Sequence, residues 1–177
     1  MKYTTVKAAA LAGPILLGSQ VQAATIGIFG SNSPGNIASF LNANGHTATA
    51  LGFGPSAAEL AGLDAAILLR TSGNALDSWV RGGGTLITEW TGADWATNTV
   101  DYFGAQISGG GFIGTGTNIT ISAAGLNLDL GNGLSNPWSD GPRTEFARNV
   151  SDTGSATVYA TRAGGNAAVF GGAIDDG

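Results

Sequence analysis

Residues 64–90 read DAAILLRTSGNALDSWVRGGGTLITEW, and they contain two apolar runs separated by an amphipathic segment. The continuous apolar run Ala65–Leu69 is typical of a strand that is covered on both faces. Three glycines, Gly82–Gly84, precede the second run, Thr85–Trp90, which also predicts a strand. Because two parallel strands need a crossover between them, the stretch predicts a parallel strand–helix–strand unit.

The segment between the two runs predicts a helix that begins at Asn74. Asn is a favoured cap residue, and Asp77 stands three positions later, as in a weak capping box. Leu76, Trp79 and Val80 are spaced by three and four residues, so they share one helix face. We expect this apolar face to dock on the sheet.

The residues before this unit show the same alternation. Thr25–Phe29 and Thr47–Leu51 predict two further strands, and the Ser33-Pro34 pair between them predicts a helix start. A capping-box pattern at Ser56–Glu59 predicts a short helix. The order predicts an α/β fold in three layers, with a mostly parallel sheet between helices.

The apolar positions of these elements predict the core. In the strands we expect burial of Ile26, Ile28, Ile67, Leu69, Leu86 and Ile87, and on the helices we expect Phe40, Leu41, Leu76 and Trp79 to cover them.

The amino-acid composition changes after Trp90. Residues 97–116 are rich in Gly, Thr and Asn and predict a Gly-rich β insertion, and residues 132–143 predict a loop. Four short antiparallel strands are expected after the insertion: Asn118–Ser122, Leu126–Leu130, Thr157–Thr161 and Ala167–Ala173. Asp175-Asp176-Gly177 is a hairpin signal with no strand after it, so we expect a domain truncated at its C-terminus.

The N-terminus predicts export. Lys2 and Lys7, the apolar run Ala8–Leu17 and the small-x-small site Val21-Gln22-Ala23 form a secretory signal peptide, residues 1–23. We expect the mature chain, residues 24–177, to be one domain that is periplasmic or extracellular.

Composition excludes several classes of site and partner. The chain has no Cys, so disulfides, thiolate nucleophiles and cysteine metal sites are absent. Both lysines precede the expected cleavage site, which leaves five arginines against twelve acidic residues. A negative chain repels phosphate backbones and anionic lipid, so we expect neither nucleic acid nor membrane as a partner of the mature domain.

Several motifs resemble one superfamily. TIGIFGSNS (25–33), LDAAILLR (63–70) and above all LDSWVRGGGTLITEW (76–90) resemble the class I glutamine-amidotransferase-like superfamily, which is flavodoxin-like in layout. GLSNPW (133–138), Glu145, ATVYAT (156–161) and AAVFGG (167–172) are similar to its ThuA-like and related secreted branches. The resemblance implies a single amidotransferase-like α/β domain over 24–177, with a further strand expected after Gly177.

The chain departs from this family where the chemistry would lie. Active amidotransferases resemble one another in a Cys at the sharp turn after a strand, whereas here Thr85–Glu89 leads into WTGADW. The single His, His46, precedes the second strand and should lie at the amino end of the sheet, opposite the ligand-binding end. A base must reach its nucleophile, so we predict no catalytic residues. We also predict no cofactor and no metal site.

The candidate ligand-binding residues follow the predicted strands, where parallel sheets bind ligands. They are Ser31, Asn32, Arg70, Ser72, Glu89 and Trp90. Arg70 and Glu89 could orient a carboxylate or a sugar, with Trp90 or Trp95 as a stacking face. The favoured alternative is an Arg–Glu pair that only closes the sheet. The loop Gly30–Asn36 could also hold a phosphate or flavin, although a tight turn before a helix explains it more simply.

Three functions remain open. The leading hypothesis is a secreted, non-catalytic amidotransferase-like domain that binds a small molecule, glycan or protein partner. An alternative is a carbohydrate hydrolase that uses carboxylates among Glu89, Asp94 and Asp101. The third is a structural module of a surface protein.

Overall fold

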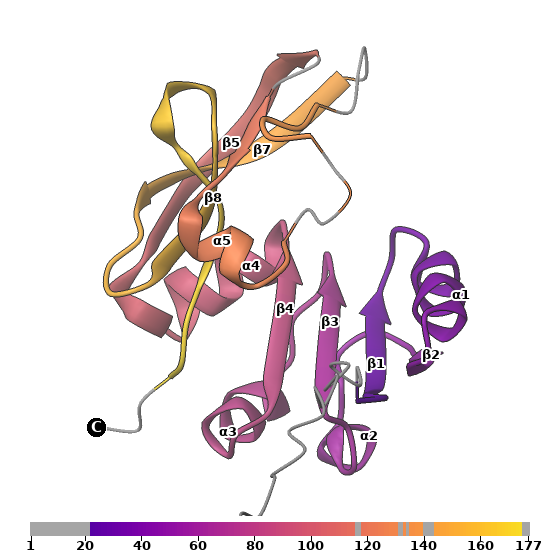
Figure 1. The fold of residues 1–177 in the computed structure, drawn as a ribbon. Helices are drawn as coiled ribbons and strands as arrows, with labels where there is room; N and C mark the ends of the chain where they lie inside the picture. The colour runs from indigo at the N-terminus through magenta and orange to yellow at the C-terminus, as the bar shows by residue number, and fades with distance from the viewer. Residues whose placement is uncertain (1–21, 116–117, 131–132, 134, 140–143, 175–177) are drawn as a thin grey trace, which may run out of the picture.

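A four-stranded, all-parallel sheet forms from the first half of the chain (Figure 1). Its order is β2-β1-β3-β4, with bounds β1 Thr25–Gly30, β2 Thr47–Ala50, β3 Ala65–Leu69 and β4 Thr85–Glu89. The computed structural model describes residues 22–115, 118–130, 133, 135–139 and 144–174. Residues 1–21 of the predicted signal peptide, half of the predicted loop 132–143 and the predicted turn 175–177 therefore lie outside the described residues.

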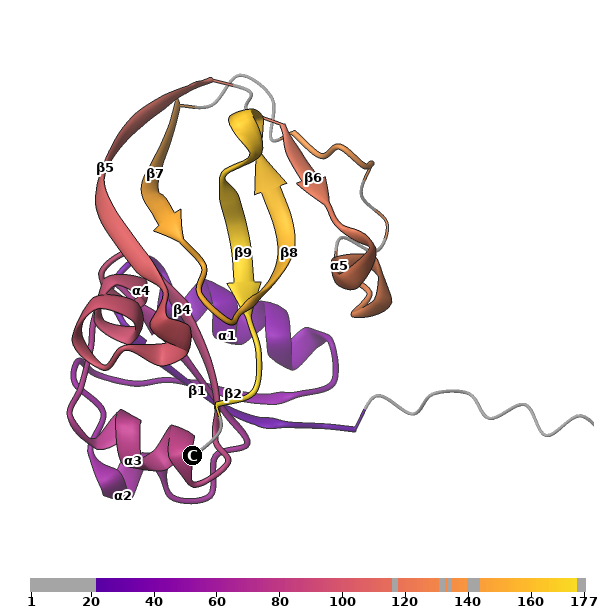
Figure 2. The ribbon, with the colours of Figure 1, turned by 90° about the vertical axis from the view of Figure 1, so that its left-hand side faces the viewer.

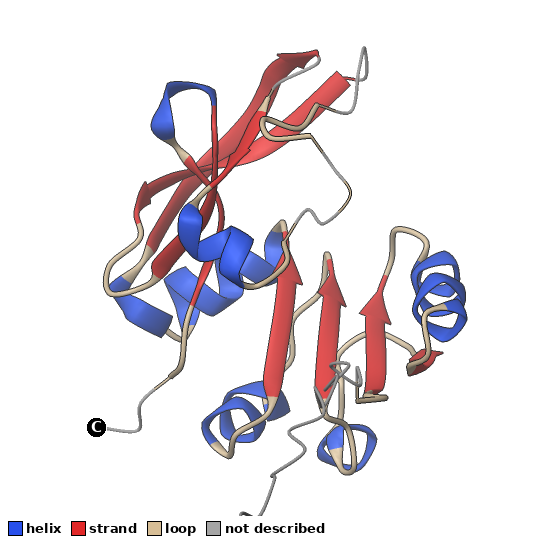
Figure 3. Cartoon of the chain, viewed as in Figure 1, coloured by secondary structure: helices blue, strands red, loops and turns tan. Residues whose placement is uncertain are grey.

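Helices cover both faces of the parallel sheet (Figure 3). Helix α1 (Pro34–Ala43) packs through Ala38 against the face that carries Ile26 and Ile28. Helices α2 (Ala57–Leu60) and α3 (Ala75–Arg81) pack against the opposite face. The predicted parallel α/β core is thus confirmed.

Two of the predicted helix starts are confirmed, and the cap predicted at Asn74 is wrong. Pro34 opens α1, and Ser56 and Glu59 form a reciprocal capping box, with Glu59 Oε2 accepting from Ser56 N at 2.9 Å. Asn74 has helical backbone angles, and its side chain makes no cap hydrogen bond. The first turn begins one residue earlier, where Leu76 N donates to Gly73 O. Ser33 is left-handed and makes no cap hydrogen bond either.

The predicted core is confirmed in part. Leu76 and Ile28 are fully buried, but Phe40 is 66% exposed and Ile87 is 54% exposed. Ile87 is exposed because α1 packs against β1 and β2 and leaves the same face of β4 uncovered. On α1 itself, Ala38 takes the buried position and Phe40 points outward. The other predicted core positions are buried or packed partly buried against the core: Ile26, Leu41, Ile67, Leu69, Trp79 and Leu86.

The second half of the chain forms antiparallel strands on the side toward which the parallel strands point (Figures 1 and 2). Strand β5 (Gln106–Thr115) pairs with β7 (Thr144–Asp152), and a three-stranded sheet has the order β6-β8-β9. The bounds are β6 Ile119–Ile121, β8 Thr157–Arg162 and β9 Ala167–Gly171. Short helices α4 (Thr91–Asp94), η1 (Trp95–Thr99) and η2 (Tyr102–Gly104) join β4 to β5, and η3 (Ala163–Gly165) joins β8 to β9.

Three of the four predicted antiparallel strands are confirmed. The fourth, Leu126–Leu130, is wrong, because Ser122 caps a short helix, α5 (Ala123–Asn127), by accepting from Gly125 N at 3.1 Å. Strand β7 was not predicted. Among the described residues, no helix has the length and apolar character needed to cross a membrane.

Candidate functional site

The carboxyl ends of β1, β3 and β4 point to the same edge of the sheet, as their arrowheads show in Figure 1. The order β2-β1-β3-β4 reverses direction between β1 and β3, and open α/β sheets bind ligands at such a switch point. We call the six predicted residues at this edge the strand-end surface: Ser31, Asn32, Arg70, Ser72, Glu89 and Trp90.

A backbone contact joins the loops after β1 and β3. Ser31 N donates to the carbonyl of Leu69 at 3.0 Å, directly before Arg70. Gly30 has φ 102°, and a Cβ there would overlap the Leu69 carbonyl oxygen, so only glycine permits this approach. Asn32 follows with φ 74°. The switch-point loops therefore lie side by side, as predicted.

Arg70, Glu89 and Trp90 converge at the ends of β3 and β4. Arg70 Nε lies 3.7 Å from Glu89 Oε1, and the guanidinium carbon lies 5.9 Å from the centroid of the Trp90 ring. The side chains of Arg70 and Glu89 are 52% and 39% exposed. The ion pair is longer than a hydrogen bond, so Arg70 keeps its donors for another partner. Glu89 Oε1 is buried and accepts no hydrogen bond within the described residues, so this carboxylate has unused acceptor capacity.

Trp90 lies in a strained turn between β4 and α4. Its angles are φ 51° and ψ −115°, which non-glycine residues rarely adopt. A Cβ on Gly92 would lie 3.0 Å from Thr71 O and 3.2 Å from Leu68 Cβ, so α4 starts in close contact with β3. In hydrolases, a strained strand-to-helix turn presents the nucleophile. Here the same kind of turn presents an indole.

Ser72 lies toward the loop after β2 rather than toward this trio. Its carbonyl would be 3.9 Å from a Cβ on Gly54, and its own side chain is exposed. The same loop carries Phe53, which is 69% exposed and was not among the predicted site residues. An aromatic residue between two glycines directly after a strand was the sequence signal that could have identified it.

Two other predicted roles change with the structure. Trp95 is 9% exposed and packs edge-on against Tyr102, so it is a core residue, and the stacking role proposed for it is wrong. Asp101 is exposed at the start of η2, after the chain has left the sheet. Within the described ranges, no group of three His, Asp or Glu side chains is arranged to hold a metal ion.

His46 lies at the amino end of the sheet, as predicted. Its Nδ1 accepts from Ala24 N at 3.2 Å, and the adjacent Thr47 pairs with Thr25 at the start of β1. A depression of about 480 Å³ also lies at this end, lined by Leu63, Asp64, Ser78, Trp79 and Gly82–Gly84. It contains none of the strand-end residues. The Asp64 carboxylate on its wall accepts from Thr25 N at 2.8 Å, so this acid already has a structural partner.

No family model, curated protein or solved structure matches the chain.

Proposed function

We propose that this chain is a secreted, non-catalytic, amidotransferase-like domain with a flavodoxin-like core, and that it binds a small polar ligand such as a sugar on the strand-end surface. The observation that carries the proposal is the convergence of Arg70, Glu89 and Trp90 beside the β1/β3 switch point. A guanidinium, a carboxylate and an indole combine directional hydrogen bonding with an apolar face.

The chemistry of the three groups suits a polyol. Glu89 accepts hydrogen bonds from ligand hydroxyls, and Arg70 donates hydrogen bonds to ligand oxygens. Their opposite charges offset each other, so a neutral ligand leaves no buried net charge. The Trp90 ring offers its apolar surface to the carbon–hydrogen face of a sugar.

The turn at Trp90 also supports the proposal that the domain is non-catalytic. A nucleophilic mechanism requires a nucleophile within hydrogen-bond reach of a base. The strained turn after β4 holds Trp90, and the single His of the chain lies at the opposite end of the sheet. Glu89 and Arg70 are then binding residues rather than catalytic ones.

Calorimetric titration of neutral mono- and oligosaccharides into the 177-residue chain tests the proposal. We expect binding that Glu89→Gln weakens at least about tenfold, a loss of about 1.4 kcal/mol. Asp129→Asn is the matched control, because it also turns an exposed acid into its amide at a residue that is not one of the six of the strand-end surface. Loss of sugar binding in both variants, or no binding by the parent chain, would overturn the proposal. Release of reducing sugar that stops in Glu89→Gln would establish the hydrolase alternative instead.

The secreted location is tested separately by N-terminal sequencing of exported protein. We expect the mature chain to begin at Ala24, because Val21-Gln22-Ala23 has the small-x-small pattern of a cleavage site. Soluble cytoplasmic protein that retains Met1 would contradict it.

A further inference from the structure

Phe53 lies in the loop after β2, the one strand of the sheet that contributes no residue to the strand-end surface. Its side chain is 69% exposed, although it is one of the larger apolar residues of the chain. The loop that carries it is anchored on both sides: Gly52 O accepts from Gly30 N at 3.1 Å, and a Cβ on Gly73 would lie 3.0 Å from Pro55 Cδ. The loop after β2 is therefore packed against the loops after β1 and β3.

Contacts of this kind connect the carboxyl ends of all four strands. The β2 loop contacts the β1 loop through Gly52 and Gly30, and Ser31 contacts the end of β3 at Leu69. Arg70 contacts Glu89 and Trp90 at the end of β4. The four strand-end loops are thus connected in the order of the sheet, with an exposed aromatic residue, Phe53, in the first, polar residues in the next two and Trp90 in the last.

We infer that the strand-end surface binds a linear oligosaccharide rather than a single sugar, with Phe53 and Trp90 as its two aromatic end contacts. The inference rests on the proposed function and specifies the ligand class. Four neighbouring strands span three inter-strand steps of about 4.8 Å, or about 14 Å in all. That distance exceeds one sugar ring and requires a chain of several.

The order of the groups determines how such a chain binds. The Trp90 end also carries Arg70 and Glu89, so one sugar unit is fixed there by hydrogen bonds and ring contact. Ser31 and Asn32, both exposed, offer hydroxyl and amide groups to the units between. Phe53 provides apolar contact for the far unit only, because β1 and β3 separate its strand from β4.

The test is calorimetric titration of β-1,4-linked glucose and N-acetylglucosamine oligomers of one to six units into the full chain. We expect affinity to rise at least about tenfold between the single sugar and the longest oligomer. In Phe53→Ala, the part of this gain that comes from the far unit should be lost, so the affinity ratio of hexamer to monomer should fall. Phe40→Ala is the matched control, because Phe40 is 66% exposed on α1 and should leave the length dependence intact.

The outcomes separate this inference from the function on which it rests. Affinity that is independent of length, or a length dependence that Phe53→Ala leaves unchanged, overturns the inference. The proposed function stands in either case if sugar binding is still weakened by Glu89→Gln. Failure of every oligomer to bind overturns both. Melting curves of Phe53→Ala and Phe40→Ala should match that of the parent chain, because both side chains are mainly in solvent.

Discussion

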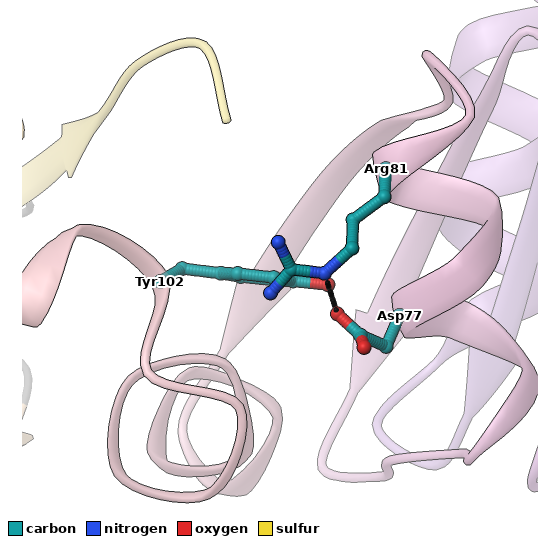
Figure 4. Close-up of polar contacts among 3 residues, drawn as sticks. All are labelled: Asp77, Arg81 and Tyr102. Atoms are coloured by element: carbon teal, nitrogen blue, oxygen red, sulfur yellow. Dashed lines mark hydrogen bonds and ion pairs between the residues drawn. The ribbon is translucent and has the colours of Figure 1, made fainter. Parts of the chain in front are cut away.

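The hydroxyl of Tyr102 donates a hydrogen bond of 3.0 Å to Asp77 Oδ1, and the same oxygen accepts from Arg81 Nε at 3.0 Å (Figure 4). Tyr102 is 4% exposed, and the Arg81 guanidinium carbon lies 5.7 Å from the centroid of its ring. Asp77 and Arg81 belong to α3, whereas Tyr102 begins η2. The three residues therefore attach the chain that leaves the parallel sheet to a helix on that sheet.

Removing the hydroxyl alone should weaken this attachment. Tyr102→Phe keeps the ring but leaves Asp77 with one donor fewer, so we expect a loss of about 1.5–3 kcal/mol, as for hydrogen bonds to charged groups. Urea denaturation measures the change. Tyr159→Phe is the control, because the Tyr159 hydroxyl makes no hydrogen bond within the part of the chain that is described. Equal losses in the two variants would refute a specific role for the Tyr102–Asp77 bond.

The same contact predicts loss of stability in alkali. Burial, and then the hydrogen bond to Asp77, raise the pKa of Tyr102 above its usual value. The folded chain then holds this proton at a pH where the unfolded chain has lost it. The stabilisation is complete below the ordinary Tyr pKa of about 10 and falls as the pH rises above it. Between pH 9 and 11 the parent chain should lose more stability than Tyr102→Phe, and parallel curves would contradict the assignment.

The Trp79 ring leaves no room for a side chain at position 84, which is glycine. A Cβ at 84 would overlap the indole ring, which packs partly buried against the core. The backbone of Gly84 does not have positive φ, so the constraint is steric overlap with the ring. Gly84→Ala should therefore cost about 1–3 kcal/mol, the usual range for overpacking.

A double-mutant cycle checks the cause. In a Trp79→Leu background, Gly84→Ala should cost much less, because the overlapping ring is gone. Gly35→Ala is the control: nothing lies within 4 Å of a Cβ there, and Gly35 is in α1, so alanine should stabilise by about 0.5–1 kcal/mol. An unchanged cost in both backgrounds would show that the ring does not set the penalty.

Asparagine side chains pair with the backbone of three strands. Asn42 donates to Ala48 O at 2.9 Å and accepts from Ala48 N at 2.8 Å, on edge strand β2. Asn98 makes the same two bonds with Ile107, and Asn136 with Ile121. Each amide supplies both partners that a neighbouring strand would supply, so it satisfies one residue at the edge of a sheet.

Asn42→Asp should cost about 1 kcal/mol, because a carboxylate keeps the acceptor for Ala48 N but places a second acceptor opposite Ala48 O. Asn36→Asp in the exposed first turn of the same helix should cost nothing, because a negative charge is favoured there. Thermal denaturation at neutral pH compares the two variants. A larger loss in Asn36→Asp would contradict the pairing role of Asn42.

The parallel half of the fold could be predicted because its signals are local. The apolar run Ala65–Leu69, the proline at 34 and the Ser56–Glu59 box each act within a few residues, and each is found in the structure. The exposure of Ile87 could not be predicted in this way. It depends on which strands α1 covers, and that is a property of the whole sheet.

The candidate site also contains some residues that local sequence signals could predict and others that depend on contacts distant in sequence. The strand ends placed Arg70, Glu89 and Trp90 correctly at one edge, because parallel strands all end there. Phe53 was missed because a single exposed aromatic residue gains meaning only from its neighbours in space. Trp95 was wrongly predicted to be a surface residue. In the structure its ring packs against Tyr102 in the core, and this contact between η1 and η2 could not be read from the sequence.

The turn at Trp90 yields the last prediction. With φ 51° and ψ −115°, it should accept glycine more readily than alanine, because only glycine adopts such angles without strain. Both Trp90→Gly and Trp90→Ala remove the indole, so their difference isolates the backbone. We expect the glycine variant to be more stable by about 1–3 kcal/mol, the usual cost of a strained non-glycine residue.

A neighbouring position provides the control for this comparison. Thr85 is exposed on β4 and has no positive φ, so there alanine should be more stable than glycine by about 0.5–1 kcal/mol. Urea denaturation of the four variants gives both differences in one experiment. If alanine were also the more stable residue at position 90, the turn would relax once the indole is removed. The strain would then belong to the packing of Trp90 itself, and the view that β4, α4 and the close contact of Gly92 impose this conformation would be wrong.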